Sequence, residues 1–374
     1  MRALRRRLLD HYDLHRRELP WRHERDPYRI WVSEVILQQT RVETAIPFYH
    51  RWVERFPTLE ALAEADREEV MAAWSGLGYY RRARHLHEAA RVVRDRMAGE
   101  LPREARDLTA LPGIGPYTAG AVASIAFGRR EPAVDGNARR VLSRLFDLDR
   151  ASAAELDGVA RPLVPPDRPG DFNQALMELG ATVCRPRAPE CARCPLEELC
   201  LARRRGTVDR RPRPRRREEV PVFVVGTAVL SSLEGRVLLA RRPEEGLLGG
   251  TWEFPGALAS RRESPARAAR RTARRWLGRD PAPLSPQEAS TIVPHAFSHR
   301  RHVYHAFRFR PVEETEVDVR AVVGRGEGPG RDGMPAWTAA AWVPLGAAGR
   351  RSLPSAQRAI LRSLLADEGL GRPA

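Results

Sequence analysis

The four cysteines of this chain constrain its fold more than any other feature of the sequence. All of them lie within the seventeen residues CRPRAPECARCPLEELC, as Cys184, Cys191, Cys194 and Cys200. Disulfide frameworks spread their cysteines through small secreted chains, and this sequence is not of that kind. Four thiolates in one loop instead suit a tetrahedral metal ion or a cubic iron–sulfur cluster. The residues alone favour a metal centre and leave both zinc and iron–sulfur open.

The charge of the chain points to a polyanionic partner or to an arginine-rich composition, and these two explanations are about equally good. The net charge is +16, and all 64 basic residues are arginine because the chain has no lysine. A Schiff base needs a lysine amine, so this chemistry is excluded for the side chains. With 374 residues, 42% of them hydrophobic, the chain is expected to fold into two domains.

The sequence carries no recognisable targeting or membrane segment. Its first residues, MRALRRRLLDHYDLHRREL, are basic but include acidic residues and lack the apolar run of a signal peptide. No stretch offers the roughly 18 apolar residues of a membrane-spanning helix. We therefore expect no membrane partner and a cytoplasmic, nucleoid-associated protein.

Up to about residue 200 the hydrophobic pattern predicts helices. Asp26 and Pro27 are typical of a helix start, and Thr40 with Glu43 predicts a capping box for the next helix. Glu34 lies beside Trp31 and Val35 at helical spacing, on or next to the buried face. A glutamate there is most often a surface residue, but a carboxyl in an apolar setting has a raised pKa and can act as a general acid.

The segment LPGIGPYTAG, residues 111–120, predicts a tight turn that leads into a helix starting at Pro116. Gly113 and Gly115 would let backbone N–H groups approach an anion at the helix N-terminus. This is the pattern of a helix-hairpin-helix, which binds a DNA phosphate without contacting the bases that distinguish one sequence from another. A plain turn between two helices is the alternative. Asp135 follows in VDGNARRVLSRLF and by itself is most simply a helix N-cap.

Taken together, the motifs resemble the MutY family of adenine DNA glycosylases, in the helix-hairpin-helix or endonuclease III-like superfamily. The 6-2-5 spacing of the cysteines is that of the iron–sulfur loop of this superfamily, and zinc sites usually pair two CxxC units where this chain has one. The matching segments, in order, are PWR at 20–22, SEVILQQTRV at 33–42, GLGYYRRARHLH at 76–87, LPGIGPYTA at 111–119, VDGN at 134–137, NQALMELG at 173–180 and the cysteine loop.

The resemblance implies hydrolysis of an N-glycosidic bond after the base has been flipped out of the duplex. Glu34 would protonate adenine N7, and Asp135 would stay ionised and stabilise the sugar cation, with or without a transient covalent adduct. The flipped adenine would lie near Trp21, Arg22 and Glu178. Tyr79 and Gln39 would enter the gap in the duplex, although an aromatic residue such as Tyr79 is more often part of a core. The same motifs add Thr40, Leu77, Tyr117 and Asn137 to the substrate site.

The resemblance also implies that the strand is not cut. Superfamily members that cut it use a lysine in the helix-hairpin-helix, and Tyr117 resembles the residue that replaces this lysine in MutY. The cofactor implied is one [4Fe-4S] cluster with a structural role, bound by the four cysteines. The arginines around it, Arg185, Arg187, Arg193 and Arg203, are candidates for phosphate contacts.

The second half predicts a different architecture. RRRGTVDRRPRPRRR, residues 203–217, predicts an extended linker. Strand patterns follow at 220–230, 236–242 and 299–310, with a helix near 265–277. This part resembles the Nudix-like domain of MutY, which favours 8-oxoguanine opposite adenine. The resemblance assigns this recognition to Phe297, Ser298 and His299. Nudix hydrolases carry glutamates on that helix to bind Mg²⁺, and here Arg271, Arg274 and Arg275 stand in their place, so we do not expect nucleotide hydrolysis.

The predicted organisation is therefore multi-domain. An all-α helix-hairpin-helix glycosylase domain with an iron–sulfur loop (1–203) is followed by a linker (204–220) and an α+β Nudix-like domain (221–374). The expected partner is duplex DNA with 8-oxoguanine·adenine or guanine·adenine mispairs, bound by a monomer. The rival functions are a glycosylase for oxidised pyrimidines, a nucleotide-pool hydrolase and a non-catalytic iron–sulfur DNA-binding protein.

Overall fold

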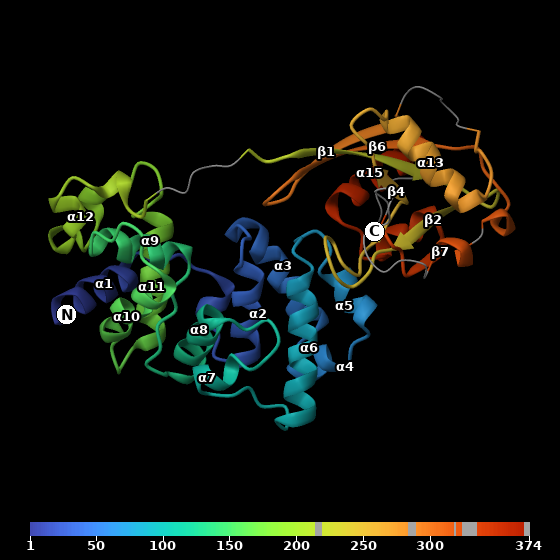
Figure 1. Cartoon of the computed structure of the whole chain (residues 1–374). Helices are drawn as coiled ribbons and strands as arrows, with labels where there is room; N and C mark the ends of the chain where they lie inside the picture. Colours follow the sequence, from blue (N-terminus) through green and yellow to red (C-terminus); the bar gives the residue numbers. More distant parts are fainter. Residues whose placement is uncertain (214–218, 283–288, 318, 324–334, 370–374) are drawn as a thin grey trace. The chain divides into compact units, whose positions relative to one another are not determined.

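A computed structural model of the chain describes residues 1–213, 219–282, 289–317, 319–323 and 335–369 (Figure 1). Two compact units emerge from the contacts between residues. The first unit is Met1–Ala65 with His85–Arg217, and the second unit is Asp66–Arg84 with Glu218–Ala374. Part of the predicted linker, residues 214–218, lies outside the described residues. No helix that the structure describes is both long and apolar enough to cross a membrane.

This division differs from the predicted one at residues 66–84, which we assigned to the helical domain. In the second unit, the hydroxyls of Ser75 and Tyr80 both donate hydrogen bonds to the carbonyl of Leu353, at 2.7 and 3.1 Å. Arg67 forms an ion pair with Glu244 at 2.8 Å. These contacts join segments that lie about 180 to 280 residues apart in the sequence. Local sequence patterns do not predict contacts between residues so far apart.

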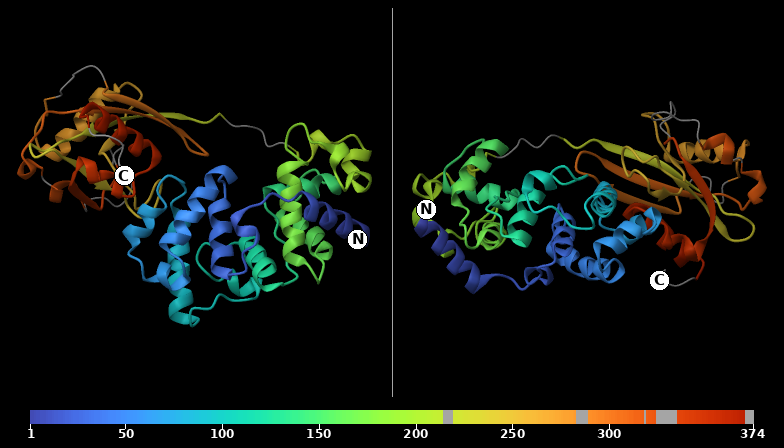
Figure 2. Two further views of the ribbon diagram at one scale, coloured as in Figure 1. Left: turned by 180° about the vertical axis from the view of Figure 1, so that it is seen from behind. Right: turned by 90° about the horizontal axis from the view of Figure 1, so that it is seen from below.

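The first unit is helical, as predicted (Figure 2). Its elements are α1 (Arg2–His15), η1 (Pro20–Arg22), α2 (Pro27–Leu37), α3 (Val42–Arg55), α4 (Leu59–Glu64), α6 (Arg81–Arg96, which starts in the second unit), α7 (Ala105–Leu108), α8 (Pro116–Phe127), α9 (Gly136–Leu145), α10 (Ala153–Ala160), η2 (Arg161–Leu163), α11 (Pro169–Thr182), η3 (Cys191–Arg193), η4 (Glu197–Leu199), α12 (Leu201–Arg204) and η5 (Val208–Arg210). Helix α5 (Arg67–Ala73) belongs to the second unit.

The residues that cap the helix N-termini help to position the site residues. The Asp26 carboxylate accepts from the N–H of Tyr28, and the Asp135 carboxylate caps α9 in the same way, so both predicted N-caps are confirmed. The predicted capping box at Thr40 is wrong. Helix α3 starts one residue later, after Arg41, without a side-chain cap, and the Thr40 hydroxyl donates instead to the carbonyl of Gln38 at 3.4 Å.

One core of the first unit joins the start of the chain to the helices around the cysteine loop. Side chains of α1, α9 and α11 pack together with Leu196, and Cys184, Cys194 and Cys200 lie against this cluster. Helix α8 is buried from Thr118 to Ser124, so its residues are apolar or small on every side. The core thus fixes α9 and α11 relative to one another. Helix α8 is joined to α11 by a buried hydrogen bond from the Asn173 amide to the Ser124 hydroxyl at 2.8 Å. These three helices carry Tyr117, Asn137 and Glu178.

The second unit contains two sheets. The four-stranded sheet has the order β4–β1–β6–β5, in which β1 and β6 are parallel and the other pairs antiparallel. The three-stranded sheet has the order β3–β2–β7 and is antiparallel. The strands are β1 (Val222–Val229), β2 (Arg236–Arg241), β3 (Trp252–Glu253), β4 (Gly256–Leu258), β5 (Thr291–Ala296), β6 (Arg301–Arg308) and β7 (Ala339–Pro344).

Helices cover the four-stranded sheet on two sides. The remaining elements are α13 (Pro265–Leu277), η6 (Glu314–Glu316), α14 (Val319–Val322), η7 (Leu345–Arg350) and α15 (Ser355–Asp367). Along β1, Val225 and Val229 join the core with α15, whereas Ala228 and Leu230 join the core with α13. This alternation is the period of a strand that is buried on both faces. The predicted α13 and three predicted strands are confirmed to within two residues at each end.

Candidate active site and cysteine loop

The predicted site residues of the first unit converge on one cavity of about 730 Å³. Its walls come from η1, from the end of α2, from the start of α8, from the turn before α9 and from α11. The predicted residues that line it are Trp21, Arg22, Glu34, Gln39, Thr40, Tyr117, Asp135, Asn137 and Glu178. The fold therefore brings together side chains that are more than 150 residues apart in the sequence.

Glu34 is a buried carboxyl in this cavity, with 5% of the residue exposed. The hydroxyl of Tyr117 donates a hydrogen bond to its carboxylate. Burial raises the pKa of Glu34 to about 7, and the negative charge of Asp135 acts in the same direction, whereas the hydrogen bond from Tyr117 opposes both. A carboxyl with this pKa is divided between its protonated and ionised forms at neutral pH, as a general acid requires.

Asp135 has a different environment. Its carboxylate accepts hydrogen bonds from the backbone N–H of Ala138 at 2.7 Å and from the side-chain amide of Asn137 at 3.0 Å. Burial raises the pKa of Asp135, but these hydrogen bonds act against the rise because they stabilise the ionised form. The two carboxyls thus share one cavity in which burial raises the pKa of both. At Asp135 several hydrogen bonds to the carboxylate and the charge of Arg140 oppose this rise, whereas Glu34 reaches a pKa of about 7.

Glu178 is neutralised by two arginines. Its carboxylate accepts from Arg17 at 2.7 Å and from Arg22 at 2.5 Å. Burial would raise the pKa of Glu178, but the hydrogen bond from Arg17 and the charges of both arginines outweigh it and lower the pKa. Trp21 packs edge-on against Tyr49 with ring centroids 5.5 Å apart. Arg17 did not feature in the sequence prediction, and no local pattern marks it.

A hydrogen-bonded chain connects the active site to the cysteine loop. Arg140 of α9 donates to the side-chain oxygen of Asn137 at 2.8 Å, and Asn137 in turn donates to Asp135. The same guanidinium donates to the carbonyls of Gly180 and Cys184, at 2.7 and 2.8 Å. Sequence analysis missed Arg140, although its place one helical turn after Asn137 puts both on one face of α9.

The turn before α8 has the geometry of the predicted helix-hairpin-helix. Gly113 has a φ of +74°, and a Cβ built there would lie 2.4 Å from the Cβ of His85, so only glycine fits. Gly115 precedes α8 with a φ of −90° and has open space at its Cβ position. The α8 N-terminus therefore presents backbone N–H groups with no side chain at Gly115 to cover them.

Two loop residues that the resemblance places in the DNA gap have left-handed backbones. Gln39 has a φ of 58° and Tyr79 a φ of 48°. Such conformations are strained for residues with a side chain and gather at functional sites. The Tyr79 residue is 45% exposed, and the guanidinium of Arg82 lies 5.6 Å from the centre of its ring. Leu77 and Tyr79 belong to the second unit and do not line the cavity.

The four cysteines line a single small cavity in their loop. No group of three His, Cys, Asp or Glu side chains, among those the structure describes, is arranged to hold a single metal ion. Four thiols around one cavity are a donor set that suits a tetrahedral metal ion or an iron–sulfur cluster. Burial raises the pKa of Cys194 to about 12, so this thiol keeps its proton unless a metal replaces it.

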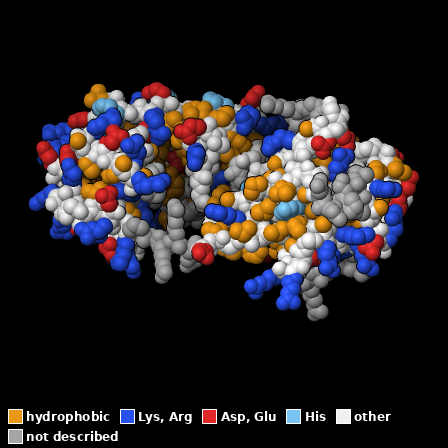
Figure 3. Space-filling view, turned by 90° about the horizontal axis from the view of Figure 1, so that it is seen from above, with side chains coloured by type: hydrophobic (Ala, Val, Ile, Leu, Met, Phe, Trp, Pro, Cys, Tyr) orange, Lys and Arg blue, Asp and Glu red, His pale blue; other side chains and the backbone are white. Residues whose placement is uncertain are grey.

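Acidic neighbours pair with three of the four arginines around the cysteine loop. Glu190 binds Arg185 and Arg193 at 2.7 and 2.6 Å, and Glu197 binds Arg203 at 3.1 Å. Figure 3 shows the wider pattern, in which arginine side chains are scattered over the face drawn, many beside acidic ones. On this face the basic side chains are therefore spread out rather than gathered in one patch.

In the second unit, Phe297, Ser298 and His299 form the loop of the β5–β6 hairpin. The Phe297 N–H donates to the carbonyl of Arg300 at 2.8 Å and closes the loop. The Phe297 ring contacts His302, with ring centroids 5.0 Å apart, whereas Ser298 and His299 are exposed. The loop is thus anchored by the phenylalanine and presents a hydroxyl and an imidazole to solvent.

The helix that carries metal-binding glutamates in Nudix hydrolases is α13, and it bears Arg271, Arg274 and Arg275. The guanidinium of Arg271 binds both carboxylate oxygens of Glu263 at 3.0 Å. The buried Glu253 is held by Arg242 at 2.8 Å and by the indole N–H of Trp337 at 2.9 Å. These two glutamates are thus already engaged by protein groups.

Comparisons with known proteins agree with this arrangement. The profile of the HhH-GPD superfamily of base excision DNA repair proteins matches residues 32–166, and that of the NUDIX domain matches residues 226–363. The adenine DNA glycosylase of Homo sapiens is 40% identical over 374 aligned residues, which cover 84% of this chain and 68% of the human protein. The adenine DNA glycosylase of Mus musculus is 40% identical over 365 aligned residues, or 82% of this chain and 70% of the mouse protein.

Among solved structures, a thermostable thymine-DNA glycosylase superposes with a TM-score of 0.52 and 32% sequence identity. The superposition covers 55% of this chain and 96% of that protein. The likeness therefore concerns only part of this chain.

Proposed function

The chain belongs to the adenine DNA glycosylases, within the HhH-GPD superfamily of base excision DNA repair proteins, and we propose that it removes adenine paired with 8-oxoguanine or guanine in duplex DNA and leaves the strand uncut. The observation that carries this proposal is the pair of carboxyls, Glu34 and Asp135, in one cavity: burial raises the pKa of Glu34 to about 7, and at Asp135 hydrogen bonds from Ala138 and Asn137 oppose the rise. An oxocarbenium-like transition state needs one carboxyl that gives a proton and one that stays charged.

In the proposed reaction Glu34 donates its proton to N7 of the flipped adenine. The bond between C1′ of the sugar and N9 of adenine then breaks, and the electron pair leaves with the protonated base. Asp135 stabilises the cation that develops at C1′, directly or through a transient covalent bond. Water adds to C1′ and gives up a proton, which restores Glu34. A pKa of about 7 at Glu34 supports the first step because the proton is available at neutral pH.

The base is held in the same cavity. Arg22 lies between Glu178 and the hydroxyl of Tyr12, at 2.5 and 2.7 Å, so its guanidinium is fixed before substrate binds. Trp21 and Arg22 are then the candidates for contacts with adenine, and Glu178 holds Arg22 in place. The family resemblance assigns Gln39 and Tyr79 to the gap in the duplex and adds Thr40 and Leu77 to the substrate site. Gly113 and Gly115 would receive a phosphate of the DNA backbone.

The absence of lysine supports a glycosylase that stops after base removal. Strand cutting by a Schiff base needs a side-chain amine, and the chain has none. At the corresponding helix entrance stands Tyr117, whose hydroxyl bonds Glu34. Treatment with borohydride in the presence of substrate should therefore trap no protein–DNA adduct at a side chain.

We propose one [4Fe-4S] cluster bound by Cys184, Cys191, Cys194 and Cys200. The chemistry of the four thiols around one cavity fits this group, which would cross-link the loop and take no part in base removal. Ser298 and His299, exposed beside the anchored Phe297, would recognise 8-oxoguanine opposite adenine. We further propose that the protein acts as a monomer on duplex DNA, associated with the nucleoid in the cytoplasm.

One assay separates this function from its rivals. The protein is incubated with duplexes that contain 8-oxoguanine·adenine, guanine·adenine or an oxidised pyrimidine, and half of each sample is treated with alkali. We expect a break at adenine only, and only after alkali, with faster cleavage opposite 8-oxoguanine. A break without alkali would contradict the monofunctional chemistry, and cleavage at the oxidised pyrimidine would favour the nearest rival.

A further inference from the structure

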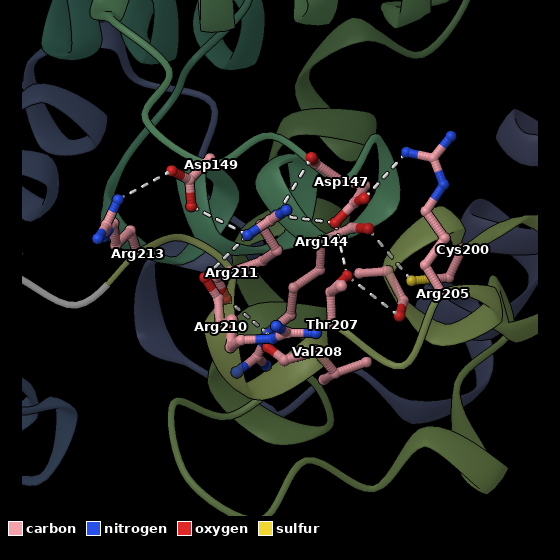
Figure 4. Close-up of polar contacts among 11 residues, drawn as sticks. Arg144, Asp147, Asp149, Cys200, Arg205, Thr207, Val208, Arg210, Arg211 and Arg213 are labelled. Atoms are coloured by element: carbon pink, nitrogen blue, oxygen red, sulfur yellow. Dashed lines mark hydrogen bonds and ion pairs between the residues drawn. The ribbon is translucent and has the colours of Figure 1, made fainter.

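The first part of the predicted linker is docked against the turn that follows α9 (Figure 4). The Thr207 hydroxyl donates to one carboxylate oxygen of Asp147 at 2.5 Å, and Arg211 donates to the same oxygen at 2.7 Å. Arg205 pairs with the other oxygen at 3.0 Å. Three linker residues thus converge on one carboxylate, which is only 5% exposed.

A second acidic residue extends this contact. Arg211 also pairs with Asp149 at 2.9 Å, and the backbone N–H of Arg213 donates to the carbonyl of Asp149 at 3.0 Å. Exposed ion pairs contribute little when isolated, but several that share acceptors in one network contribute more. We call residues 205–213 the docked segment. The docked segment packs against the first unit and does not form part of an extended linker. The sequence, by contrast, predicts that the linker starts at residue 204.

Arg144 lies behind the docked segment and contacts the cysteine loop as well. Only 3% of this arginine is exposed. Its guanidinium donates to the carbonyls of Val208 and Arg211 in the docked segment, at 3.1 and 3.0 Å. It also donates to the carbonyl of Arg185 at 2.7 Å and to the Sγ atom of Cys184 at 3.3 Å.

A buried guanidinium needs partners for all its N–H groups, since leaving a charged donor unsatisfied costs free energy. Here those partners come from two segments, the docked segment and the cysteine loop, so neither can move away without leaving N–H groups of Arg144 unpaired. When Cys184 is a thiolate ligand, its contact with Arg144 becomes a charge-assisted hydrogen bond, which is stronger than one to a neutral thiol. A change in the metal ligation of Cys184 therefore changes the hydrogen bonding of Arg144, which also holds the docked segment.

We propose that Arg144 is a positioning residue that joins the iron–sulfur loop to the docked segment, so that the bound cluster fixes the point at which the linker leaves the helical domain. The proposal rests on the cofactor and function proposed above. A linker that starts at a fixed point is effectively shorter, which raises the effective concentration of the second domain at the DNA. Release of residues 205–213 would lengthen the tether and weaken discrimination opposite adenine.

The test is hydrogen exchange of the full chain, read by mass spectrometry on peptides that cover 205–213. The variants are Arg144→Met, Arg144→Lys and Asp147→Asn, with Arg161→Met as control because it removes an exposed, ion-paired arginine of the same unit. Asparagine tolerates the left-handed backbone of Asp147 (φ 55°), so the change removes charge and little else. Wild-type protein stripped of iron by oxidation and chelation is measured alongside.

We expect Arg144→Met and iron removal to speed exchange of residues 205–213 by roughly tenfold or more, since several hydrogen bonds are lost together. Arg144→Lys should have a smaller effect, and Arg161→Met none. Because hydrogen bonds to a ligand sulfur help to set the potential of a cluster, Arg144→Met should also shift its reduction potential to a more negative value. Asp147→Asn should speed exchange but leave the potential unchanged.

Unchanged exchange of 205–213 in Arg144→Met that has kept its iron, or in the iron-free wild type, would overturn the proposal. If Arg144→Met does not fold, the Arg144→Lys variant and the iron-free wild type decide in the same way. Iron and sulfide content and adenine excision are measured on every sample. Failure of the cofactor or of the glycosylase assignment is then seen separately from failure of the coupling.

Discussion

The hydroxyl of Tyr117 donates a hydrogen bond to the carboxylate of Glu34, and this contact joins the start of α8 to the buried face of α2. It connects the helix-hairpin-helix, which is expected to hold the DNA backbone, with the group expected to protonate the base. Tyr117 also lies 3.4 Å from the sulfur of Met177 on α11. The tyrosine therefore orients the acid from a position that is itself packed.

Replacement of Tyr117 by phenylalanine should raise the pKa of Glu34 further. The hydrogen bond stabilises the ionised carboxylate, and its loss leaves only the charge of Arg22 to oppose burial and the charge of Asp135. A hydrogen bond of about 1 kcal/mol corresponds to a shift of roughly 0.7 pH units. The measurement is the pH dependence of single-turnover adenine release, whose alkaline limb should move to higher pH. A limb that stays in place would show that the tyrosine does not set this pKa.

Replacement of Glu34 by glutamine should stabilise the fold at high pH. The folded-state pKa of about 7 lies above the usual 4.5, so the folded protein binds this proton more tightly than the unfolded chain. The contribution of Glu34 to wild-type stability is thus fully present below pH 4.5 and is lost as the pH rises through about 7. This difference corresponds to about 3 kcal/mol. In urea unfolding, Glu34→Gln should exceed the wild type at pH 8 by up to this amount and lose that advantage near pH 5.

The two glycines of the helix-hairpin-helix should respond differently to alanine. Gly113→Ala places a Cβ against His85 on a left-handed backbone, and we expect a loss of about 2 kcal/mol or more in stability. Gly115→Ala has space for its methyl group and an ordinary φ, so its melting temperature should stay at the wild-type value. Its affinity for undamaged duplex should nevertheless fall, because the methyl group hinders the approach of a phosphate to the α8 N-terminus. Equal melting temperatures for the two variants would contradict the geometry.

The double substitution Ser298→Ala and His299→Ala should reduce the preference for 8-oxoguanine over guanine opposite adenine. Both side chains are exposed in the β5–β6 loop and Phe297 still anchors it, so the fold should be unaffected. Loss of hydrogen bonds worth about 1 to 1.5 kcal/mol would lower the ratio of excision rates roughly tenfold. Deletion of residues 221–374 should have a larger effect in the same direction. An unchanged ratio in both proteins would remove this loop from the recognition site.

Local sequence signals predicted much of the fold. Asp26 and Asp135 cap helices as their residue types indicate, and Pro116 and Pro265 start helices as predicted. Thr40 failed as a cap because its side chain bonds Gln38 instead, a choice between two local partners that the sequence does not reveal. Such competing hydrogen bonds differ by too little free energy to be ranked from residue type.

The sequence did not reveal which arginines are buried and hold other segments in place. Arg140 and Arg144 stand in a chain with 64 arginines, and nothing local distinguishes them from those on the surface. Their roles come from carbonyls of segments about 40 and 65 residues away, which only the packed structure brings together. The proposed catalytic pair, Glu34 and Asp135, was predicted through the family resemblance, and the pKa of Glu34 comes from burial that the fold alone creates.

The most direct test of this account is the rate of adenine release from an 8-oxoguanine·adenine duplex in a single turnover, measured for the wild type and Glu34→Gln between pH 5 and pH 9. The wild-type rate should fall on the alkaline side as Glu34 ionises near pH 7. Glu34→Gln should lose at least about a hundredfold, which is the usual contribution of a general acid, and should show no such limb. Release of adenine by Glu34→Gln at the wild-type rate would contradict the central claim that the proton comes from this buried carboxyl.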